Sequence, residues 1–254
     1  MLNREKILEK LEKSGVNPPK IVFYELTDST NTRAKEYAKE HPENKDTVIF
    51  IANAQSAGRG RRGRSFVSNA GAGIYMSILT YPDEKASDAT VVTAKTAVAL
   101  AKATDKICGC ETKIKWVNDL YLGGKKLAGI LVEGETDEKG KIAYQVVGMG
   151  INIYKNAISD EISDIATSIE GELNHAPDRS ELAARIIENF LFDSSDFYQE
   201  YKARSFVIGR EVTVIKLTES YKAEVIDIDK DFSLIIDRGG MTERLFTGEI
   251  ILKI

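Results

Sequence analysis

The sequence predicts an α/β or α+β sheet domain followed by a small β-barrel. Strand and helix patterns alternate up to about residue 206, and an apolar fraction of 43% is typical of a globular core. After Gly209, short strands follow one another at turns, which favours a small barrel. A length of 254 residues suits one large domain with a small appendage. We therefore expect two domains, at 1–206 and 207–254.

The first part of the chain alternates helical and extended patterns. Ile7, Leu8 and Leu11 recur among charged residues after Asn3, a good helix cap, so a short amphipathic helix is expected. A continuous apolar, β-branched run further on predicts a buried strand. In order, the expected elements are a helix at 3–13, a strand at 21–26, a helix that opens within 27–30 and ends near 40, and strands at 47–54 and 74–80.

The same alternation continues after residue 80. An Ala- and Val-rich segment predicts a long helix on the sheet, and Gly123-Gly124 predicts a two-residue hairpin turn. Asp178 with Glu181 matches a capping box, so one helix should run from there to about Tyr201. The expected elements are a helix at 88–107, strands at 112–117, 120–122, 125–132 and 141–153, a helix at 178–201, and short strands at 212–215, 223–228, 234–236 and 245–246.

Composition limits the kind of protein this can be. Thirty-five Lys and Arg against 39 Asp and Glu leave a net charge of −4, so a cationic function must be local. Cys108 and Cys110 cannot by themselves make a disulfide framework or a complete metal site, and they read as thiols of a reducing compartment. The charged start lacks a secretory apolar core, and no apolar run is long enough to span a bilayer. We expect a soluble cytoplasmic protein.

The strongest local signal is the segment from Gly58 to Arg64, which holds four arginines and three glycines in seven residues. We call it the Gly-Arg loop. Glycine allows positive φ and close backbone approach, so N–H groups can face oxygen atoms. Arginine adds permanent charge and forked donors that suit phosphate or carboxylate. The loop is therefore interpreted as a mobile clamp on a small anionic ligand.

Four other interpretations of the Gly-Arg loop are weaker. It matches the G-x-G-x-x-G dinucleotide pattern and approaches the phosphate-loop pattern, but both require a helix immediately afterwards, and residues 65–71 do not look helical. A nucleic-acid-binding arginine–glycine tail is disfavoured because the loop lies between two buried strands. A solvated charge cluster rarely interleaves glycine in this way.

Three further motifs each have an ordinary structural explanation when taken alone. Residues 115–119 read KWVND, 125–133 read KKLAGILVE, and 148–152 read GMGIN. Trp116 is more often a core residue, and Lys126 is more often solvated. Strand pairing would nevertheless bring Lys126 near the end of the KWVND segment.

Together, these motifs resemble those of the biotin protein ligase family over about residues 20–254. The resemblance is carried, in order, by Asp28-Ser29-Thr30-Asn31, Gln55 before the Gly-Arg loop, KWVND, KLAGILVE and GMGIN. It implies an α+β catalytic domain with a mixed sheet, like that of class II aminoacyl-tRNA synthetases, and an SH3-like C-terminal β-barrel. It also implies that biotin and MgATP react to give biotinyl-5′-AMP, from which a lysine of a biotin carboxyl carrier protein takes the acyl group.

Matching motif positions implies roles for individual residues. Lys126, Arg61 and Asp119 would be catalytic; Asp119 would either accept a proton from the incoming lysine or bind Mg²⁺, and the sequence leaves both open. The residues implied for biotin are Ser29, Thr30, Asn31, Gln55, Gly58, Arg59, Gly60, Arg61, Lys126, Gly129 and Gly148. Those implied for ATP or the adenylate are Arg59, Arg61, Arg62, Arg64, Phe66, Lys115, Asn118, Lys126 and Asn152, with Arg62 and Arg64 serving pyrophosphate or bracing the loop.

The sequence departs from the family pattern in three ways. Phe66 stands where the family usually has tryptophan, and Val117 replaces a common proline, which makes the turn before Asn118 less rigid. Bifunctional members carry an N-terminal winged helix-turn-helix, which one short helix cannot supply. The resemblance therefore implies a monofunctional enzyme that binds no nucleic acid and no membrane. It leaves a homodimer open, because family members often pair through the central sheet.

Two alternatives to this function remain open from the sequence. One is a lipoate- or octanoate-transferring relative of the same superfamily, which shares the acyl-transfer logic. The other is a regulator that binds biotin or biotinyl-AMP without transferring it. The presence of both Lys126 and Asp119 argues against the second alternative.

Overall fold

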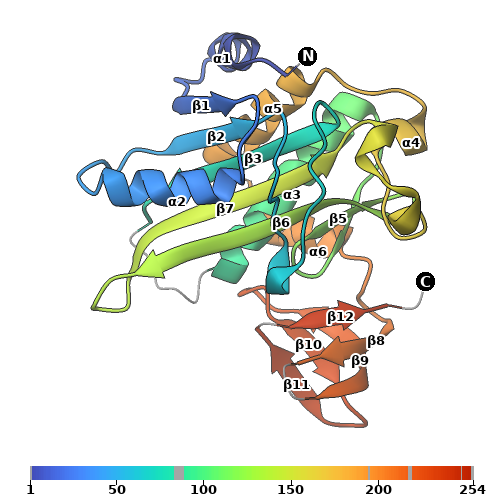
Figure 1. Cartoon of the computed structure of the whole chain (residues 1–254). Helices are drawn as coiled ribbons and strands as arrows, with labels where there is room; N and C mark the ends of the chain where they lie inside the picture. Colours follow the sequence, from blue (N-terminus) through green and yellow to red (C-terminus); the bar gives the residue numbers. More distant parts are fainter. Residues whose placement is uncertain (1, 83–88, 194, 217–218, 247, 253–254) are drawn as a thin grey trace.

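The structure is a computed structural model that describes residues 2–82, 89–193, 195–216, 219–246 and 248–252. Its main feature is a seven-stranded sheet in the order β1-β2-β3-β7-β6-β5-β4 (Figure 1). β1 and β2 are parallel, and the other neighbours are antiparallel, so the sheet is mixed. The strands are β1 (Lys20–Tyr24), β2 (Val48–Ala52), β3 (Gly73–Thr80), β4 (Lys113–Lys115), β5 (Asp119–Leu122), β6 (Lys125–Thr136) and β7 (Ile142–Asn152).

Helices cover the two faces of this sheet. α2 (Thr30–Glu40) packs on β2, β3 and β7, whereas α3 (Ala89–Cys108) and α5 (Arg179–Phe192) pack on the opposite face (Figure 1). α1 (Arg4–Lys13) lies on α5 through the buried Ile7 and Leu11. No helix in the described ranges combines the length and the apolar character needed to cross a membrane.

Most elements expected from the sequence are present. The Asn3 side chain accepts a hydrogen bond from the Lys6 amide at the start of α1, as its capping role predicts. The hairpin between β5 and β6 turns at Gly123 and Gly124, whose φ angles are 58° and 81°. Position 88, the expected start of the long helix, lies outside the described residues.

The expectation of one helix over 178–201 was wrong. α5 ends at Phe192, and a separate α6 (Phe197–Arg204) begins after a short break. On one side of the break, an Asp193 carboxylate oxygen accepts a bond from the Ser195 amide; on the other, Asp196 caps the Tyr198 amide. Short aspartate side chains that bond to nearby backbone compete with helical bonds, so these two residues divide the helix.

The C-terminal part is a five-stranded antiparallel sheet in the order β11-β10-β9-β8-β12. It corresponds to the expected small β unit, but β12, which pairs with β8, was not predicted. Three residues carry too little periodicity for prediction from sequence. The strands are β8 (Glu211–Ile215), β9 (Ser220–Ile228), β10 (Leu234–Asp237), β11 (Thr242–Leu245) and β12 (Glu249–Ile251).

An aromatic cluster joins the two sheets at the KWVND segment. The buried Trp116 indole donates a 2.8 Å hydrogen bond from Nε1 to the Phe232 carbonyl. The Phe232 ring stacks on Phe197 and meets Tyr201 edge-on, at centroid distances of 5.5 and 5.3 Å. The Tyr201 hydroxyl in turn donates to the Val117 carbonyl at 3.1 Å, and the Trp116–Val117 peptide is cis. The C-terminal sheet is thus attached directly to the segment that leads into β5.

Trp116→Phe is expected to lower the free energy of unfolding by about 1–3 kcal/mol, because the buried Phe232 carbonyl loses its donor. Urea unfolding followed by far-UV circular dichroism measures this, since Trp116 is the only tryptophan. Tyr198→Phe is the control: it removes a hydrogen bond to the Ile228 carbonyl at a half-buried position and should cost less. If Trp116→Phe were as stable as the unsubstituted protein, the hydrogen bond from Trp116 to the Phe232 carbonyl would not stabilise the fold.

Candidate active site

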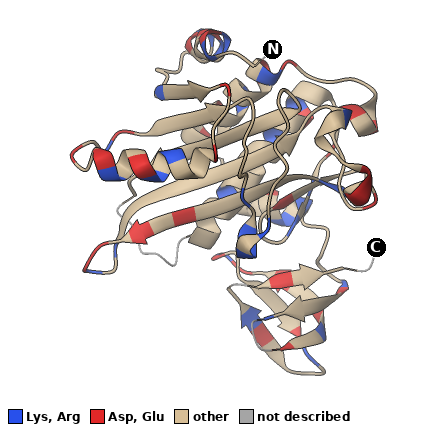
Figure 2. Cartoon of the chain, viewed as in Figure 1, with Lys and Arg blue, Asp and Glu red and all other residues tan. Residues whose placement is uncertain are grey.

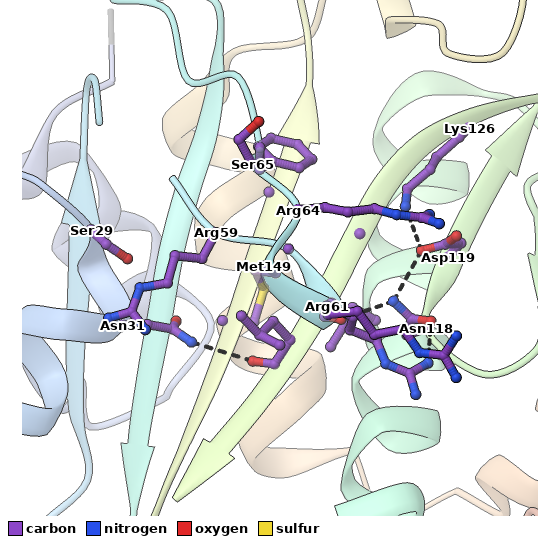
Figure 3. A pocket seen from close by; sticks show the side chains of 18 of the residues that line it. Ser29, Asn31, Arg59, Arg61, Arg64, Ser65, Asn118, Asp119, Lys126 and Met149 are labelled. Carbon is purple, nitrogen blue, oxygen red and sulfur yellow. Dashed lines mark hydrogen bonds and ion pairs between the residues drawn. The ribbon is translucent and has the colours of Figure 1, made fainter. Parts of the chain in front are cut away.

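A cavity of about 150 Å³ lies where the Gly-Arg loop crosses the ends of β5, β6 and β7 (Figure 3). Fifteen of the eighteen residues predicted for the site line it, and seven further residues complete the wall. The predicted residues that line it are Ser29, Thr30, Asn31, Gln55, Arg59, Gly60, Arg61, Arg62, Arg64, Phe66, Asn118, Asp119, Lys126, Gly129 and Gly148. The others are Ser65, Ile130, Leu131, Met149, Gly150, Gly248 and Glu249.

The Gly-Arg loop, expected to be irregular, is a tight hairpin. Gly60 donates from its amide to the Arg64 carbonyl at 2.7 Å, and Phe66 donates to the Gly58 carbonyl at 2.9 Å. Between them, one 3-10 turn spans Arg61–Gly63. Arg62 and Gly63 have φ angles of 56° and 74°, so glycine at the second position avoids the strain a larger residue would meet. The hairpin directs Arg59 toward Glu133, Arg61 toward Asn118, and both Arg62 and Arg64 toward Glu249.

One end of the cavity has a polar wall. The N-terminus of α2 supplies Thr30, whose amide and hydroxyl both donate to the Gln55 side-chain oxygen, at 2.8 and 3.1 Å. The Gln55 amide nitrogen then donates to the Ser68 hydroxyl at 2.9 Å. Ser77, fully buried on β3, bonds to the Thr30 hydroxyl and to the Asn31 side-chain oxygen at 2.7 and 2.6 Å. These bonds hold each polar group in one orientation, which suits recognition of a polar ligand group.

Glu133 of β6 anchors this wall and was not predicted. Its carboxylate accepts from the Asn31 amide at 2.8 Å and pairs with Lys35 at 2.9 Å and Arg59 at 3.4 Å. Burial raises the pKa of Glu133, but the bonds from Lys35 and Asn31 outweigh burial and hold the pKa below its usual value. Arg59 also donates to the Thr32 hydroxyl, so it lies along α2. Glu133 sits within the predicted KLAGILVE motif, but only the fold places it beside α2.

The other end of the cavity holds a linked set of charged and polar groups. The Lys126 ammonium lies 2.7 Å from an Asp119 carboxylate oxygen, as the hairpin pairing predicted. Asn118 donates to Asp119 at 3.1 Å and accepts from Arg61 at 2.9 Å (Figure 3). Burial lowers the pKa of the half-buried Arg61, against the opposing charge of Asp119. The two cations therefore reach the same space from a strand and from the loop.

The C-terminal sheet closes the cavity and braces the loop. Arg64 pairs with Glu249 at 2.9 Å, and Arg62 reaches the same carboxylate at 3.5 Å. Arg61 donates to the Gly248 carbonyl at 3.4 Å. Figure 2 shows the basic turn of the loop beside the acidic start of β12. Glu249 was missed because β12 itself was not predicted.

Three predicted residues do not line the cavity. Gly58 lies where a Cβ would stand 2.3 Å from the Phe66 carbonyl, so it permits the close packing of the loop base. Lys115 of β4 stands opposite Asp119 of β5 in the strand register, and burial lowers the pKa of Lys115 against the opposing charge of Asp119. Asn152 is buried and donates to the Thr167 carbonyl at 3.1 Å.

Glycines on β6 and β7 shape the floor of the cavity. A Cβ at Gly148 would stand 2.1 Å from the Asn31 side-chain oxygen, and one at Gly150 would stand 2.5 Å from the Phe66 ring. A Cβ at Gly129 would stand 3.4 Å from the Lys126 ammonium. Gly148 thus makes room for Asn31, and Gly150 makes room for Phe66.

The family resemblance implies that this cavity binds biotin, and Gly148→Ala is then expected to weaken that binding about 10- to 100-fold, because displacing Asn31 by overpacking costs about 1–3 kcal/mol. Isothermal titration calorimetry with biotin measures the change. Gly150→Ala is the comparison: it meets the movable end of Phe66, so biotin affinity should fall much less. Biotin affinity lowered equally in both variants would argue against a specific role of Asn31.

The cavity has the charge needed to bring anions together. Five of its side chains are cationic (Arg59, Arg61, Arg62, Arg64 and Lys126), and two are anionic (Asp119 and Glu249), although the whole chain is net negative. Its volume is below the roughly 300–1,000 Å³ typical of small-molecule sites. A ligand with both an acyl chain and a nucleotide would have to displace loop arginines from their present partners. The site can hold a carboxylate and a phosphate side by side and neutralise both.

Comparison with known proteins identifies the family. Residues 23–152, more than half of the chain, match the model of the biotin/lipoate A/B protein ligase family. The bifunctional ligase/repressor BirA of Bacillus subtilis is 28% identical, with 94% of this chain and 76% of that protein covered. The biotin–[acetyl-CoA-carboxylase] ligase of Mycobacterium tuberculosis is also 28% identical, over 81% of this chain and 79% of that protein.

A solved structure agrees over nearly the whole chain. The biotin protein ligase from Aquifex aeolicus in complex with biotin and ATP superposes with a TM-score of 0.74 and 25% identity, covering 92% of this chain and 98% of that one. The fold of this chain thus matches that of a solved biotin protein ligase over nearly its whole length. The chain belongs to the biotin/lipoate A/B protein ligase family.

Proposed function

We propose that this chain is an ATP-dependent biotin–protein ligase. In the first step, a carboxylate oxygen of biotin attacks the α-phosphorus of ATP, and pyrophosphate leaves. In the second step, the amine of an acceptor lysine attacks the acyl carbon of biotinyl-5′-AMP, an amide forms, and AMP leaves. The observation that carries the proposal is the convergence of Lys126 and Arg61 on one cavity beside a polar wall.

The first step must press one anion against another. Lys126 and Arg61 can neutralise the biotin carboxylate and the α-phosphate while both are held in place, so most of the catalysis is positioning and charge stabilisation. Arg62 and Arg64 now share Glu249 and can exchange that carboxylate for the leaving pyrophosphate. We propose that magnesium binds together with ATP, as MgATP.

The second step needs a proton acceptor. An acceptor lysine is mostly protonated at neutral pH and must lose a proton to attack. Asp119 lies at the same end of the cavity as Lys126 and is partly exposed, so it is the carboxylate we assign to this role. Once Lys126 turns toward the adenylate phosphate, Asp119 is left to accept a bond from the incoming amine.

The polar wall favours biotin over the lipoyl or octanoyl group. A ureido ring offers two N–H donors and one carbonyl acceptor, whereas a dithiolane ring or an alkyl end offers none of comparable strength. Thr30, Asn31 and Gln55 present amide and hydroxyl groups that hydrogen bonds hold in place. Asn31 lies at the cavity end away from Lys126 (Figure 3). A site built to pair polar groups rejects ligands that leave them unpaired.

ATP–pyrophosphate exchange tests this directly. The purified chain is assayed with labelled pyrophosphate and MgATP in the presence of biotin, lipoate or octanoate separately. We expect exchange with biotin alone. Exchange with lipoate or octanoate but not with biotin would replace the substrate assignment with that of the other branch of the family.

An acceptor assay separates an enzyme from a ligand-binding regulator. A biotin carboxyl carrier domain is supplied as the acceptor, and incorporation of labelled biotin is followed. We expect covalent labelling of one lysine, released by neither acid nor denaturant. Normal exchange without any transfer would instead favour a regulator that binds biotinyl-AMP.

The proposal extends to the domains and partners. We place the border between the catalytic and C-terminal domains at residue 207 and assign the C-terminal sheet to bracing the Gly-Arg loop through Glu249. Nucleic acid is not a partner in this proposal, and a salt-sensitive shift of a specific promoter fragment by the purified chain would contradict that. Sedimentation of the chain with and without biotin tests the predicted option of a homodimer.

A further inference from the structure

Among the described residues, Arg179 is the only charged residue that is buried, and it lies outside the cavity. It is the first residue of α5, and only 5% of its surface is exposed. No ion pair joins it to a carboxylate among the described residues, and its Nε has no hydrogen-bond partner. Its ring neighbour is Tyr154, 5.9 Å from the guanidinium. A helix start that needed only packing would be served better by an apolar side chain, because burying an unpaired cation is costly.

The bonds that Arg179 does make lead to the Gly-Arg loop. The two hydrogens of its Nη1 go to the Asn53 side-chain oxygen, at 3.2 Å, and to the Gly73 carbonyl, at 3.0 Å. Asn53 directly follows β2, and Gly73 is the first residue of β3. Residues 53–73 leave the sheet after β2, carry the Gly-Arg loop and return to the sheet at β3; we call this segment the excursion. One guanidinium nitrogen therefore holds both ends of the excursion.

Neighbouring contacts restrict movement around these two hydrogen bonds of Arg179, which we call the clasp. The Gly71 amide donates to the Asn53 carbonyl at 3.1 Å, and the Asn53 side chain also donates to Glu25 at 3.3 Å. β3 pairs with β7 from Gly73 onward, with Gly73 opposite Asn152, so the strand pairing holds this end of the excursion in register. The base of the excursion is thus fixed, while its tip is held by side-chain contacts of its arginines: ion pairs to Glu133 and Glu249, and hydrogen bonds such as that from Arg61 to Asn118.

We propose that Arg179 is a positioning residue that fixes the base of the Gly-Arg loop, so that the loop closes over the reaction intermediate from a defined hinge. The role rests on the proposed function only for the identity of that intermediate. Without the clasp, the whole excursion could shift relative to the sheet. Arg61 would then contact the phosphate of the intermediate in a smaller fraction of the loop conformations.

Hydrogen exchange of the unliganded protein provides the first test. Arg179→Met keeps most of the side-chain volume but removes both donors. The amides of Gln55, Phe66 and Gly71 make the hydrogen bonds within the excursion and serve as reporters. We expect their exchange to become about tenfold faster or more, while the amides of β7 and α3 keep their rates.

Arg185→Met is the matched control. Arg185 lies on the same helix at a half-exposed position, and its one ion pair within the described part of the chain is to Glu188, at 3.0 Å. It should leave the reporter amides unchanged. Arg179→Lys, which retains a charged donor, should recover part of the protection. If Arg179→Met folds poorly, Asn53→Ala removes one of the two bonds and should speed exchange of the same reporters to a smaller degree.

A second measurement links the clasp to catalysis. The half-life of biotinyl-5′-AMP on the protein should shorten in Arg179→Met and not in Arg185→Met. Uniformly faster exchange across the fold, or reporters that keep their rates, would overturn the proposal, because either result means that Arg179 only stabilises α5. If the reporters respond but no adenylate forms in the unsubstituted protein, the clasp stands and the proposed function fails.

Discussion

Lys126→Ala is expected to lower the rate of biotin-dependent ATP–pyrophosphate exchange about 100- to 1,000-fold, the usual loss when one preorganised charge-stabilising donor is removed. Its ammonium stands at the cavity end where, in the proposed reaction, carboxylate and α-phosphate meet, and no other lysine among the described residues lines that cavity. The interaction is made mainly in the transition state, so kcat should fall far more than the KM for biotin rises. Steady-state exchange at varied biotin and ATP concentrations measures both.

Lys125→Ala is the control for this prediction. The neighbouring side chain points to the other side of the strand and donates to the Ser163 carbonyl at 2.7 Å. Its removal should leave the exchange rate within a few-fold of the unsubstituted protein. If Lys126→Ala retained more than a tenth of the activity while remaining folded, the cation that stabilises the reacting phosphate would have to be another residue, with Arg61 as the first candidate.

The sequence predicted the site best where the residue types of a short motif alone indicate their function or their local structure. Glycine and arginine are informative in the Gly-Arg loop because few structural needs demand both, and the two-glycine turn placed Lys126 beside Asp119 through strand pairing alone. β2 and β3 of the large sheet were predictable because their apolar runs are buried on both faces.

The missed features depend on contacts between distant segments. Glu133, Glu249 and Arg179 look like ordinary charged residues in sequence, and each gains its role from partners far away along the chain. The break between α5 and α6 was visible in principle, because Asp193 and Asp196 flank it and favour caps over helix interiors. β12 had no such signal, since pairing with β8 creates it.

Arg61→Gly is expected to shorten the half-life of biotinyl-5′-AMP on the protein about 10- to 100-fold, since a hydrogen bond to a charged group contributes about 1.5–3 kcal/mol. Arg61 is the loop arginine that reaches deepest: it bonds to Asn118 beside Asp119 and touches the C-terminal sheet at Gly248. Without it the adenylate leaves before an acceptor arrives and acylates exposed lysines of other proteins. Retention is measured by rapid gel filtration of labelled adenylate, and release by labelling of a non-cognate protein such as serum albumin.

Arg62→Gly is the control for this prediction, because it removes the same charge from the loop but at the neighbouring position. Arg62 has a φ of 56°, which glycine adopts without strain, so the same substitution one residue later removes an exposed arginine and leaves the turn intact. Because Arg62 contacts Glu249 and the Ile215 carbonyl at the outer rim, the adenylate should be retained several-fold longer than in Arg61→Gly. If the two variants released the adenylate at the same rate, the loop would act through its total charge, and the assignment of Arg61 as the residue that holds the intermediate would be wrong.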